Sequence, residues 1–200
     1  MNNQKHFSII PLFPTPLLSL LDQSLCESVE TLFKSYSGEW TSEDENQNSR
    51  TRDINILNSN GKLLFKLTEI SKDLIGTALK IGDSIQISTS WFTRVSPGGQ
   101  GTPHSHTNSW WSGVYYFRDG MSPIRFQQFP VGIHPSKPYE SNEFNSLSFL
   151  VEPSKGTLLL FPSNVIHCIQ KNQNNFDRCT LTFNIMPKGK TGTGDSIFNY

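Results

Sequence analysis

Seven short runs rich in β-branched and aromatic residues follow one another between residues 84 and 187. They read IQISTSWFTRV, SGVYYF, IRFQQF, SLSFLVE, TLLLF, VIHCIQ and CTLTFNIM. Clusters of Gly, Pro, Asn and Ser separate these runs, as turns separate the strands of all-β proteins. The pattern is typical of a β-sandwich or barrel. We therefore predict a mainly β fold, a jelly roll with at least seven strands over about residues 84–187.

Two helices are expected before the β region, over residues 22–36 and 61–80. Their apolar residues at helical spacing are Leu25, Val29, Leu32 and Phe33 in the first, and Leu64, Leu67, Ile70, Leu74 and Ile75 in the second. We expect both helices to brace one sheet from outside. The helical segment at about 22–80 and the β core at about 84–187 then form a single domain over residues 1–200.

Charge and hydropathy limit the classes of partner. The chain has 200 residues, with 17 basic and 17 acidic side chains, so no general electrostatic attraction draws it to nucleic acid or to an anionic membrane. No stretch approaches the ~20 apolar residues of a membrane helix, and Pro11, Pro14 and Pro16 interrupt the apolar N-terminus. Three cysteines and the absence of a CxxC motif favour reduced thiols. We predict a soluble, cytoplasmic protein.

Two histidines stand one residue apart in PHSH. In an extended segment, residues i and i+2 face the same way, so His104 and His106 converge while Ser105 points away. Alone, an H-x-H pair is weak evidence for a metal site. Here it follows a flexible loop, SPGGQGTP, at a position where a strand can begin at a barrel mouth.

A third histidine, His167, lies in GTLLLFPSNVIHCIQ, which reads as a strand, a turn and a second strand. Imidazole is a common ligand of divalent transition metals, and three such donors can fill one face of an octahedron. A buried histidine that bonds only to the backbone is the alternative for His167.

Arg178 opens the strand RCTLTFNI, eleven residues after His167. If the two strands form a hairpin centred near residues 172 and 173, His167 and Arg178 are cross-strand neighbours. An arginine inside a barrel is costly unless an anion neutralises it, and a ligand carboxylate fits its planar fork. Thr180 and Thr182 share its face by alternation, whereas Cys179 points away. An exposed arginine at a strand start is the alternative.

Taken together, these pieces resemble an iron(II)- and 2-oxoglutarate-dependent oxygenase of the double-stranded β-helix type. More narrowly, the chain is similar to a bacterial and phage family with an H-x-H, an SGVYY strand and a late FPS…H…R…FN segment. The pieces that carry the resemblance are FPTPL at 13–17, PHSHTNSWWSGVYY at 103–116, GTLLLFPSNVIH at 156–167 and RCTLTFN at 178–184. Their ordered combination is specific, while each piece alone is not.

The resemblance implies a role for each matching position. His104 and His167 correspond to metal ligands, and His106 stands at the second ligand position, where the wider superfamily carries Asp or Glu. Arg178 corresponds to the residue that pairs with the far carboxylate of 2-oxoglutarate, with Thr180 and Tyr116 as hydroxyl partners. Tyr115 is expected to face the other way.

The activity implied is hydroxylation of an unidentified substrate, with Fe(II) as cofactor, 2-oxoglutarate and dioxygen as cosubstrates, and succinate and carbon dioxide as products. His106 leaves more positive charge on the metal than a carboxylate does, so zinc or nickel can also occupy the site. It can also swing away and leave a water in its place.

Two other readings stay open. A cupin-type metalloprotein fits PSNVIH, with Asn164 in place of the cupin glycine. However, no glutamate stands four or five residues after PHSH, and Arg178 has no role in a cupin. A jelly-roll binding module without catalysis is the second.

Several further segments carry expectations about substrate and assembly. Trp91, Trp110 and Trp111 lie near the expected mouth and can shape a substrate pocket or pack in the core. Residues 118–146 read as a long loop, typical of a lid, in which His134 is expected to be an exposed loop residue. The apolar stretch FSIIPLF can pair between subunits, so a homodimer is possible.

Overall fold

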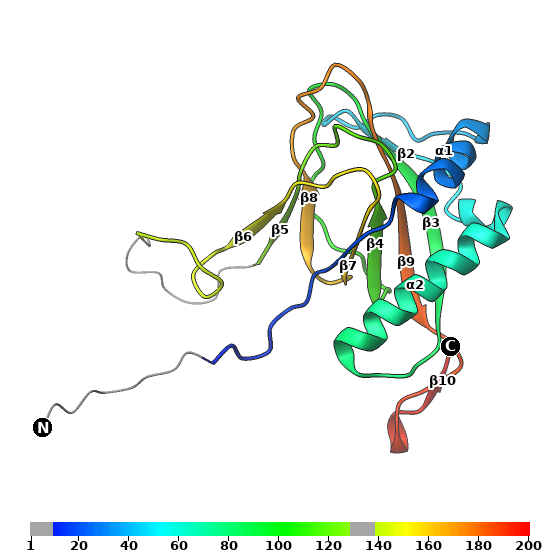
Figure 1. Cartoon of the computed structure of the whole chain (residues 1–200), viewed down its shortest axis with the longest axis vertical. Helices are drawn as coiled ribbons and strands as arrows, with labels where there is room; N and C mark the ends of the chain where they lie inside the picture. Colours follow the sequence, from blue (N-terminus) through cyan, green and yellow to red (C-terminus); the bar gives the residue numbers. More distant parts are fainter. Residues whose placement is uncertain (1–9, 129–138) are drawn as a thin grey trace, which may run out of the picture.

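Two antiparallel sheets face each other in the computed structural model, which describes residues 10–128 and 139–200 (Figure 1). The larger sheet runs β1 (Leu18–Leu21), β7 (Thr157–Pro162), β4 (Trp111–Tyr115), β9 (Arg178–Pro187), β3 (Ile85–Val95) and β2 (Asn48–Arg50). The smaller sheet runs β6 (Ser148–Val151), β5 (Ile124–Gln127) and β8 (Ile166–Ile169). A separate hairpin joins β10 (Lys190–Thr191) and β11 (Phe198–Asn199).

The predicted jelly roll is confirmed. The described residues between 84 and 187 contain the seven strands β3 to β9, and both α-helices end before residue 82. The N-terminal part adds two strands that the sequence did not indicate, β1 and β2, one at each edge of the larger sheet. This sheet is therefore wider than the seven-run pattern predicted.

Two α-helices cover the outer face of the larger sheet, as expected. The helix α1 (Cys26–Ser35) continues from a short 3₁₀ turn at Gln23–Leu25, where the Asp22 carboxylate accepts a hydrogen bond from the Ser24 amide. The longer α2 (Gly61–Leu79) begins after Asn60, whose side chain accepts from the Leu63 amide, and ends at Lys80 in the left-handed region. Shorter 3₁₀ turns lie at Ile56–Ser59 and Gly194–Ser196.

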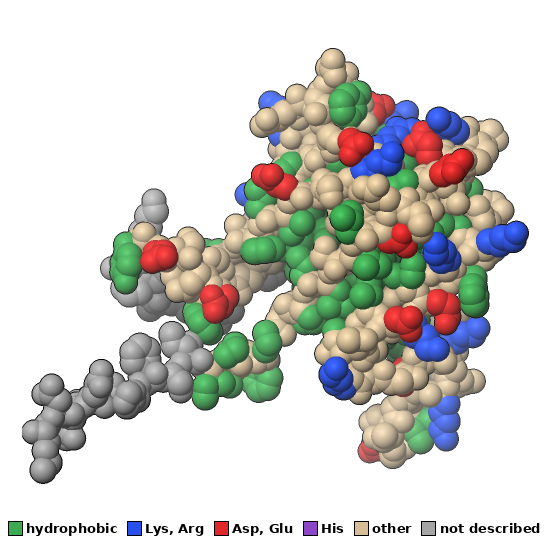
Figure 2. All heavy atoms as spheres, in the orientation of Figure 1, with side chains coloured by type: hydrophobic (Ala, Val, Ile, Leu, Met, Phe, Trp, Pro, Cys, Tyr) green, Lys and Arg blue, Asp and Glu red, His purple; other side chains and the backbone are tan. Residues whose placement is uncertain are grey.

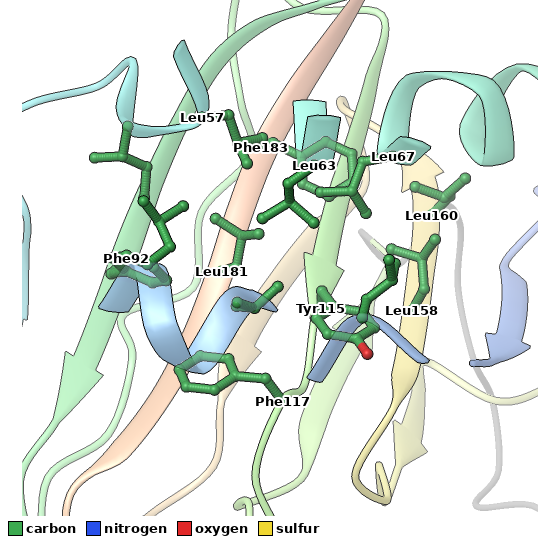
Figure 3. Close-up of a cluster of buried hydrophobic side chains, with 14 of the residues drawn as sticks. Leu57, Leu63, Leu67, Phe92, Tyr115, Phe117, Leu158, Leu160, Leu181 and Phe183 are labelled. Atoms are coloured by element: carbon green, nitrogen blue, oxygen red, sulfur yellow. The ribbon is translucent and has the colours of Figure 1, made fainter. Parts of the chain in front are cut away.

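The main core lies between these helices and the sheet (Figure 3). Leu63 and Leu67 of α2 pack there beside Leu181 and Phe183 of β9. The buried face of α2 is centred on Leu63, Leu67, Ser71 and Ile75, whereas Leu64, Ile70 and Leu74 are only partly buried. The expected apolar stripe was thus displaced by about one residue, because the small polar Ser71 occupies the middle of the contact face.

A second core fills the space between the two sheets. It joins Val114, Leu159 and Phe161 of the larger sheet to Ile124 and Phe126 of the smaller one. Since Cys179, Leu181 and Phe183 of β9 pack on the helix side, the alternate residues of β9 face the opposite sheet. These inward positions are Arg178, Thr180, Thr182 and Asn184.

The expected hairpin between the strands of His167 and Arg178 is wrong. Strand β8 pairs with β5 in the smaller sheet, and β9 pairs with β3 and β4 in the larger one. His167 and Arg178 are therefore not cross-strand neighbours. The chain crosses from one sheet to the other between residues 169 and 178, which is how a jelly roll closes around its interior.

Residues 118–146 do not form one loop, because β5 lies within them. The connection from β5 to β6 spans residues 128–147, and its part from 129 to 138, with His134, lies outside the described residues. Residues 10–17 carry no strand, so the expected N-terminal strand is absent there, while residues 7–9 lie outside the described part. No helix within the described ranges is long and apolar enough to cross a membrane.

Candidate active site

His104 and His106 of the PHSH segment meet His167 of β8 at one end of the space between the sheets. His104 and His167 exchange both backbone hydrogen bonds, at 3.0 and 2.9 Å, in an isolated antiparallel bridge. The His106 amide donates to the Ser163 carbonyl at 2.8 Å. The PHSH segment is thereby fixed against β8 and against the turn that precedes it.

The side chains of His104, His106 and His167 converge as the sequence predicted. Their ligand atoms all lie within 4.8 Å of one another, and the Nε2 atoms of His104 and His106 are 3.3 Å apart. Two nitrogens that share one metal ion at about 2.0–2.1 Å each are separated by about 2.9–3.4 Å. The spacing of this pair therefore fits a shared ion.

Hydrogen bonds at the other ring nitrogen fix the tautomer of each histidine. The Nδ1 of His104 lies 2.8 Å from the Thr102 carbonyl oxygen, and the Nδ1 of His167 lies 3.0 Å from the Val165 carbonyl oxygen. Carbonyl oxygens only accept, so both Nδ1 atoms carry the proton. Both Nε2 atoms then keep a lone pair for a ligand.

His106 is oriented by a side chain instead. Its Nδ1 lies 2.6 Å from the Oδ1 of Asn184 and 2.9 Å from the Oγ of Ser112. Oδ1 can only accept, so Nδ1 again carries the proton and Nε2 is free. All three imidazoles therefore offer Nε2 to the same point.

Burial keeps two of these rings neutral. His167 is 5% exposed, and burial lowers its pKa to about 3. Burial also lowers the pKa of His106, against the opposing effect of its bond to Asn184. A neutral imidazole is the form that binds a metal, so the protein holds both side chains ready at neutral pH.

Arg178 lies fully inside the same fold. It is 1% exposed, and burial lowers its pKa although Tyr116 opposes this effect. Its guanidinium donates to the Thr180 hydroxyl at 3.3 Å, the Tyr116 hydroxyl at 3.3 Å and the Ser122 carbonyl at 3.5 Å. None of these partners is an acid, and within the described part of the chain no salt bridge includes Arg178.

This environment leaves the arginine short of partners. A guanidinium has five N–H donors, and three long hydrogen bonds to neutral oxygens compensate poorly for its desolvation. Burial raises the pKa of Tyr116, which therefore stays protonated and cannot supply the missing negative charge. The arrangement is suited to a bound anion, in the manner of an arginine that receives a carboxylate.

The neighbouring positions follow the predicted alternation. Tyr116 and Thr180 face Arg178, whereas Tyr115 packs on the helix side and donates to the Asp22 carbonyl at 2.7 Å. Cys179 also lies in the helix-side core. The inward face of β9 thus carries a polar row from Arg178 at one end to Asn184 beside His106 at the other.

Of the three tryptophans expected near the mouth, Trp91, Trp110 and Trp111, one lies beside the histidines. The ring centroid of Trp91 is 5.6 Å from that of His106. Trp111 is buried in the helix-side core, and Trp110 packs against the same core. The sequence expectation of a pocket wall therefore applies to Trp91 alone.

Sequence reasoning missed Asn184 and Ser112, which orient His106. The signal was present, because the alternation that places Thr180 and Thr182 on the face of Arg178 extends to Asn184. The role of Asn184 was missed because it depends on the position of His106 in the fold.

Comparison with known proteins agrees with this geometry. Residues 89–184, which include all three histidines and Arg178, match the model of a family described as "Putative 2OG-Fe(II) oxygenase". No curated protein matches the chain.

Solved structures share the fold at low sequence identity. An oxidoreductase of the 2OG-Fe(II) oxygenase family from Burkholderia pseudomallei is 12% identical, with 84% of this chain and 83% of that chain covered and a TM-score of 0.61. HygX from Streptomyces hygroscopicus, solved with nickel and 2-oxoglutarate bound, is 12% identical, with 86% and 83% covered and a TM-score of 0.58. A Pseudomonas putida prolyl-4-hydroxylase is 15% identical, with 88% and 94% covered and a TM-score of 0.58.

Proposed function

We propose that this chain is an iron(II)- and 2-oxoglutarate-dependent dioxygenase whose cofactor and cosubstrate are held by the residues described above, and the match of residues 89–184 to the 2OG-Fe(II) oxygenase family model supports this proposal. The reaction hydroxylates a substrate and releases succinate and carbon dioxide. One arrangement carries the proposal. Arg178 is buried without an acidic partner among the described residues, and the same jelly roll encloses the cluster of His104, His106 and His167.

The metal role falls to His104, His106 and His167. Three imidazole nitrogens that converge on one point suit a divalent transition metal of the iron-to-zinc series. When bound, iron(II) supplies the redox chemistry that couples decarboxylation of 2-oxoglutarate to oxidation of the substrate. The protein contributes a fixed orientation of each imidazole and a site walled on one side by Phe126 and Phe161, whose rings lie beside His167.

The cosubstrate role falls to Arg178, Thr180 and Tyr116. The guanidinium fork can bind the far carboxylate of 2-oxoglutarate in a bidentate pair, and the two hydroxyls hold the fork in place. The interior around them excludes water, which strengthens this charge pair. A metal site without cosubstrate has no use for such a cation, because the cation repels the ion.

An anaerobic titration tests the function. Protein loaded with iron(II) is titrated with 2-oxoglutarate while the visible spectrum is recorded. We expect a weak charge-transfer band that saturates at one equivalent, followed by succinate formation when oxygen is admitted. Iron binding without a band supports a cupin-type site, and absence of iron binding supports a non-catalytic module.

The finer assignments have separate support. We propose a cytoplasmic location because Cys26, Cys168 and Cys179 are all free and buried, as in proteins of reducing compartments. A homodimer is proposed on the exposed apolar arm before β1, where Ile10, Leu12 and Phe13 are 72%, 77% and 94% exposed. Figure 2 shows apolar side chains along this arm, away from the body of the molecule.

A further inference from the structure

His106 stands at the position where the H-x-D/E pattern has a carboxylate, and the side-chain amide of Asn184 hydrogen-bonds to it. Asn184 comes from β9, 78 residues after His106, and its Oδ1 meets the His106 Nδ1 at 2.6 Å. This is the shortest bond made by any of the three imidazoles, and its partner is a side chain, whereas the Nδ1 atoms of His104 and His167 bond to backbone carbonyls. We propose that Asn184 is the positioning residue that makes His106 a metal ligand through Nε2, an inference that rests on the proposed function.

The Asn184 amide bridges His106 and strand β3. Its Nδ2 donates to the Thr89 hydroxyl on β3 at 3.0 Å, while Oδ1 points toward His106. In this orientation Oδ1 faces the His106 Nδ1 as an acceptor. The strand pairing of β9 with β3 sets this geometry, because Thr89 and Asn184 are register partners.

A chain of hydroxyls completes the support. Ser112 is fully buried and contacts both the His106 Nδ1, at 2.9 Å, and the Asn184 Oδ1, at 3.0 Å. Ser112 also pairs with Ser163 at 2.8 Å, and Ser163 donates onward to Ser109 at 3.0 Å. If the Nδ1 of His106 instead accepted a proton from Ser112, it would stand 2.6 Å from a second acceptor, Oδ1, with repulsion between them. The network therefore selects the Nδ1–H tautomer.

The support of all three ligands is neutral. Within the described residues their Nδ1 partners are two backbone carbonyls, one amide and one hydroxyl, so no carboxylate bonded to the rings compensates for the carboxylate that His106 replaces. His106 cannot rely on charge to stay at the metal, as an Asp or Glu ligand does. Its occupancy depends on orientation, and Asn184 supplies that orientation.

Cobalt(II) binding to the full chain, followed by calorimetry, tests the proposal. Loss of a group that orients a metal ligand lowers metal affinity by about 10- to 100-fold. We expect that fall for Asn184→Ala. Asn184→Asp keeps an acceptor at Oδ1 and should bind cobalt(II) at least as tightly as the wild type. Ser88→Ala is the matched control, because its hydroxyl meets the backbone carbonyl of Asn184 at 3.3 Å without reaching His106.

A double-mutant cycle separates positioning from general damage. In the His106→Ala background the Asn184→Ala change should no longer lower cobalt(II) affinity, since the two side chains act through one ligand. Proton NMR of the cobalt(II) protein gives an independent signature. The wild type should show three exchangeable, paramagnetically shifted Nδ1–H resonances, and Asn184→Ala should show two.

Each outcome decides the proposal. Three results would each overturn it. The first is equal cobalt(II) affinity in Asn184→Ala and wild type, and the second is an undiminished effect of Asn184→Ala on that affinity in the His106→Ala background. The third is tenfold weaker cobalt(II) binding by Asn184→Asp. If Asn184→Ala does not fold, the Asn184→Asp affinity and its three resonances still decide. A wild type that binds no cobalt(II) overturns this inference and the proposed function together, whereas normal cobalt(II) binding without a response to 2-oxoglutarate counts against the function alone.

Discussion

His104, His106 and His167 each present Nε2 because a neutral oxygen holds the opposite ring nitrogen. This arrangement is built in the protein itself, through a carbonyl two residues before each of His104 and His167 and a side chain across the barrel for His106. The three rings reach the same point from the PHSH segment and from β8. A metal that binds there meets ligands that are already oriented.

Removal of one of the two backbone-supported histidines should abolish stoichiometric metal binding. His104→Ala or His167→Ala leaves two nitrogens, which are too few to hold one face of the ion. Anaerobic calorimetry with iron(II) measures this directly. Ser105→Ala serves as the control, because Ser105 is exposed between His104 and His106. This variant should bind iron(II) as the wild type does. Wild-type affinity in either histidine variant would show that the site assignment is wrong.

Much of the site at the residue scale could be read from the sequence, and the part that could not has a physical reason. The H-x-H spacing predicted the convergence of His104 and His106, because period-2 alternation is a local property of the backbone. The relation of His167 to Arg178 was mispredicted as a hairpin, because strand pairing depends on the crossing between sheets and not on local spacing. The part played by Asn184 is likewise a long-range result of the register of β9 with β3.

At the scale of elements, α2 stabilises the larger sheet through a narrow contact face. Leu67 is fully buried in the helix-side core, whereas Phe65, two residues earlier, is 68% exposed on the opposite side of the helix. Leu67→Ala should reduce the free energy of unfolding by about 2–5 kcal/mol through lost burial and a cavity. Urea denaturation monitored by circular dichroism measures this value. Phe65→Ala should change it by less than about 0.5 kcal/mol, and equal losses in the two variants would contradict the observed helix face.

The end of β4 is tied to α1 by a bidentate ion pair. The Arg118 Nε and Nη2 atoms donate to Glu30 at 2.7 and 2.8 Å, and the bond from Arg118 is the main cause that lowers the pKa of the Glu30 carboxyl. A carboxyl with a lowered pKa in the folded state stabilises the protein above its unfolded pKa of about 4.3 and loses that effect as the pH falls.

The pH dependence of stability should therefore differ between wild type and Glu30→Gln. We expect the variant to be less stable by on the order of 1 kcal/mol at pH 7. The difference should shrink as the pH falls from about 5 through the lowered pKa of Glu30. Denaturation midpoints across this range measure it, and a constant difference between the two proteins would contradict the role of the ion pair.

The elements themselves were predicted to different degrees. Strands β3 to β9 were predicted because β-branched and aromatic residues mark them in the sequence. β1 and β2 were missed, since LSLL follows a proline-interrupted stretch and NSR has no apolar alternation. Both strands exist because they add to an edge of a sheet that the rest of the chain forms, which is tertiary information. The predicted buried face of α2 differed from the observed one because the prediction used only large apolar residues and left out Ser71.

At the scale of the whole molecule, polar side chains of β9 line part of the space between the two sheets beside a hydrophobic core, and the formal net charge of the chain is zero. Acidic and basic side chains are interspersed over the face that carries α1 and α2 (Figure 2). This agrees with a formal net charge of zero, and this face presents no large patch of a single sign that would attract nucleic acid. Arg178 is a buried positive charge, which the surface of a polymer cannot contact.

We propose that Arg178 binds a carboxylate of 2-oxoglutarate in the same interior that holds the three-histidine metal site. Loss of a charge-assisted bidentate contact costs at least about 2 kcal/mol, which corresponds to about thirty-fold in affinity. Arg178→Ala should therefore weaken 2-oxoglutarate binding about thirty-fold or more, while metal affinity stays unchanged or rises slightly. Arg178→Lys should recover part of the loss, because the charge returns without the fork.

The deciding measurement is anaerobic calorimetric titration of 2-oxoglutarate into iron(II)-loaded wild type, Arg178→Ala and Arg178→Lys. Arg94→Ala is the matched control, since Arg94 lies on the neighbouring strand, stacks over Trp40 and pairs with Asp177. We expect wild-type affinity in the control, an intermediate value in the lysine variant and the weakest binding in the alanine variant. Equal affinity in all four proteins would show that Arg178 does not bind 2-oxoglutarate.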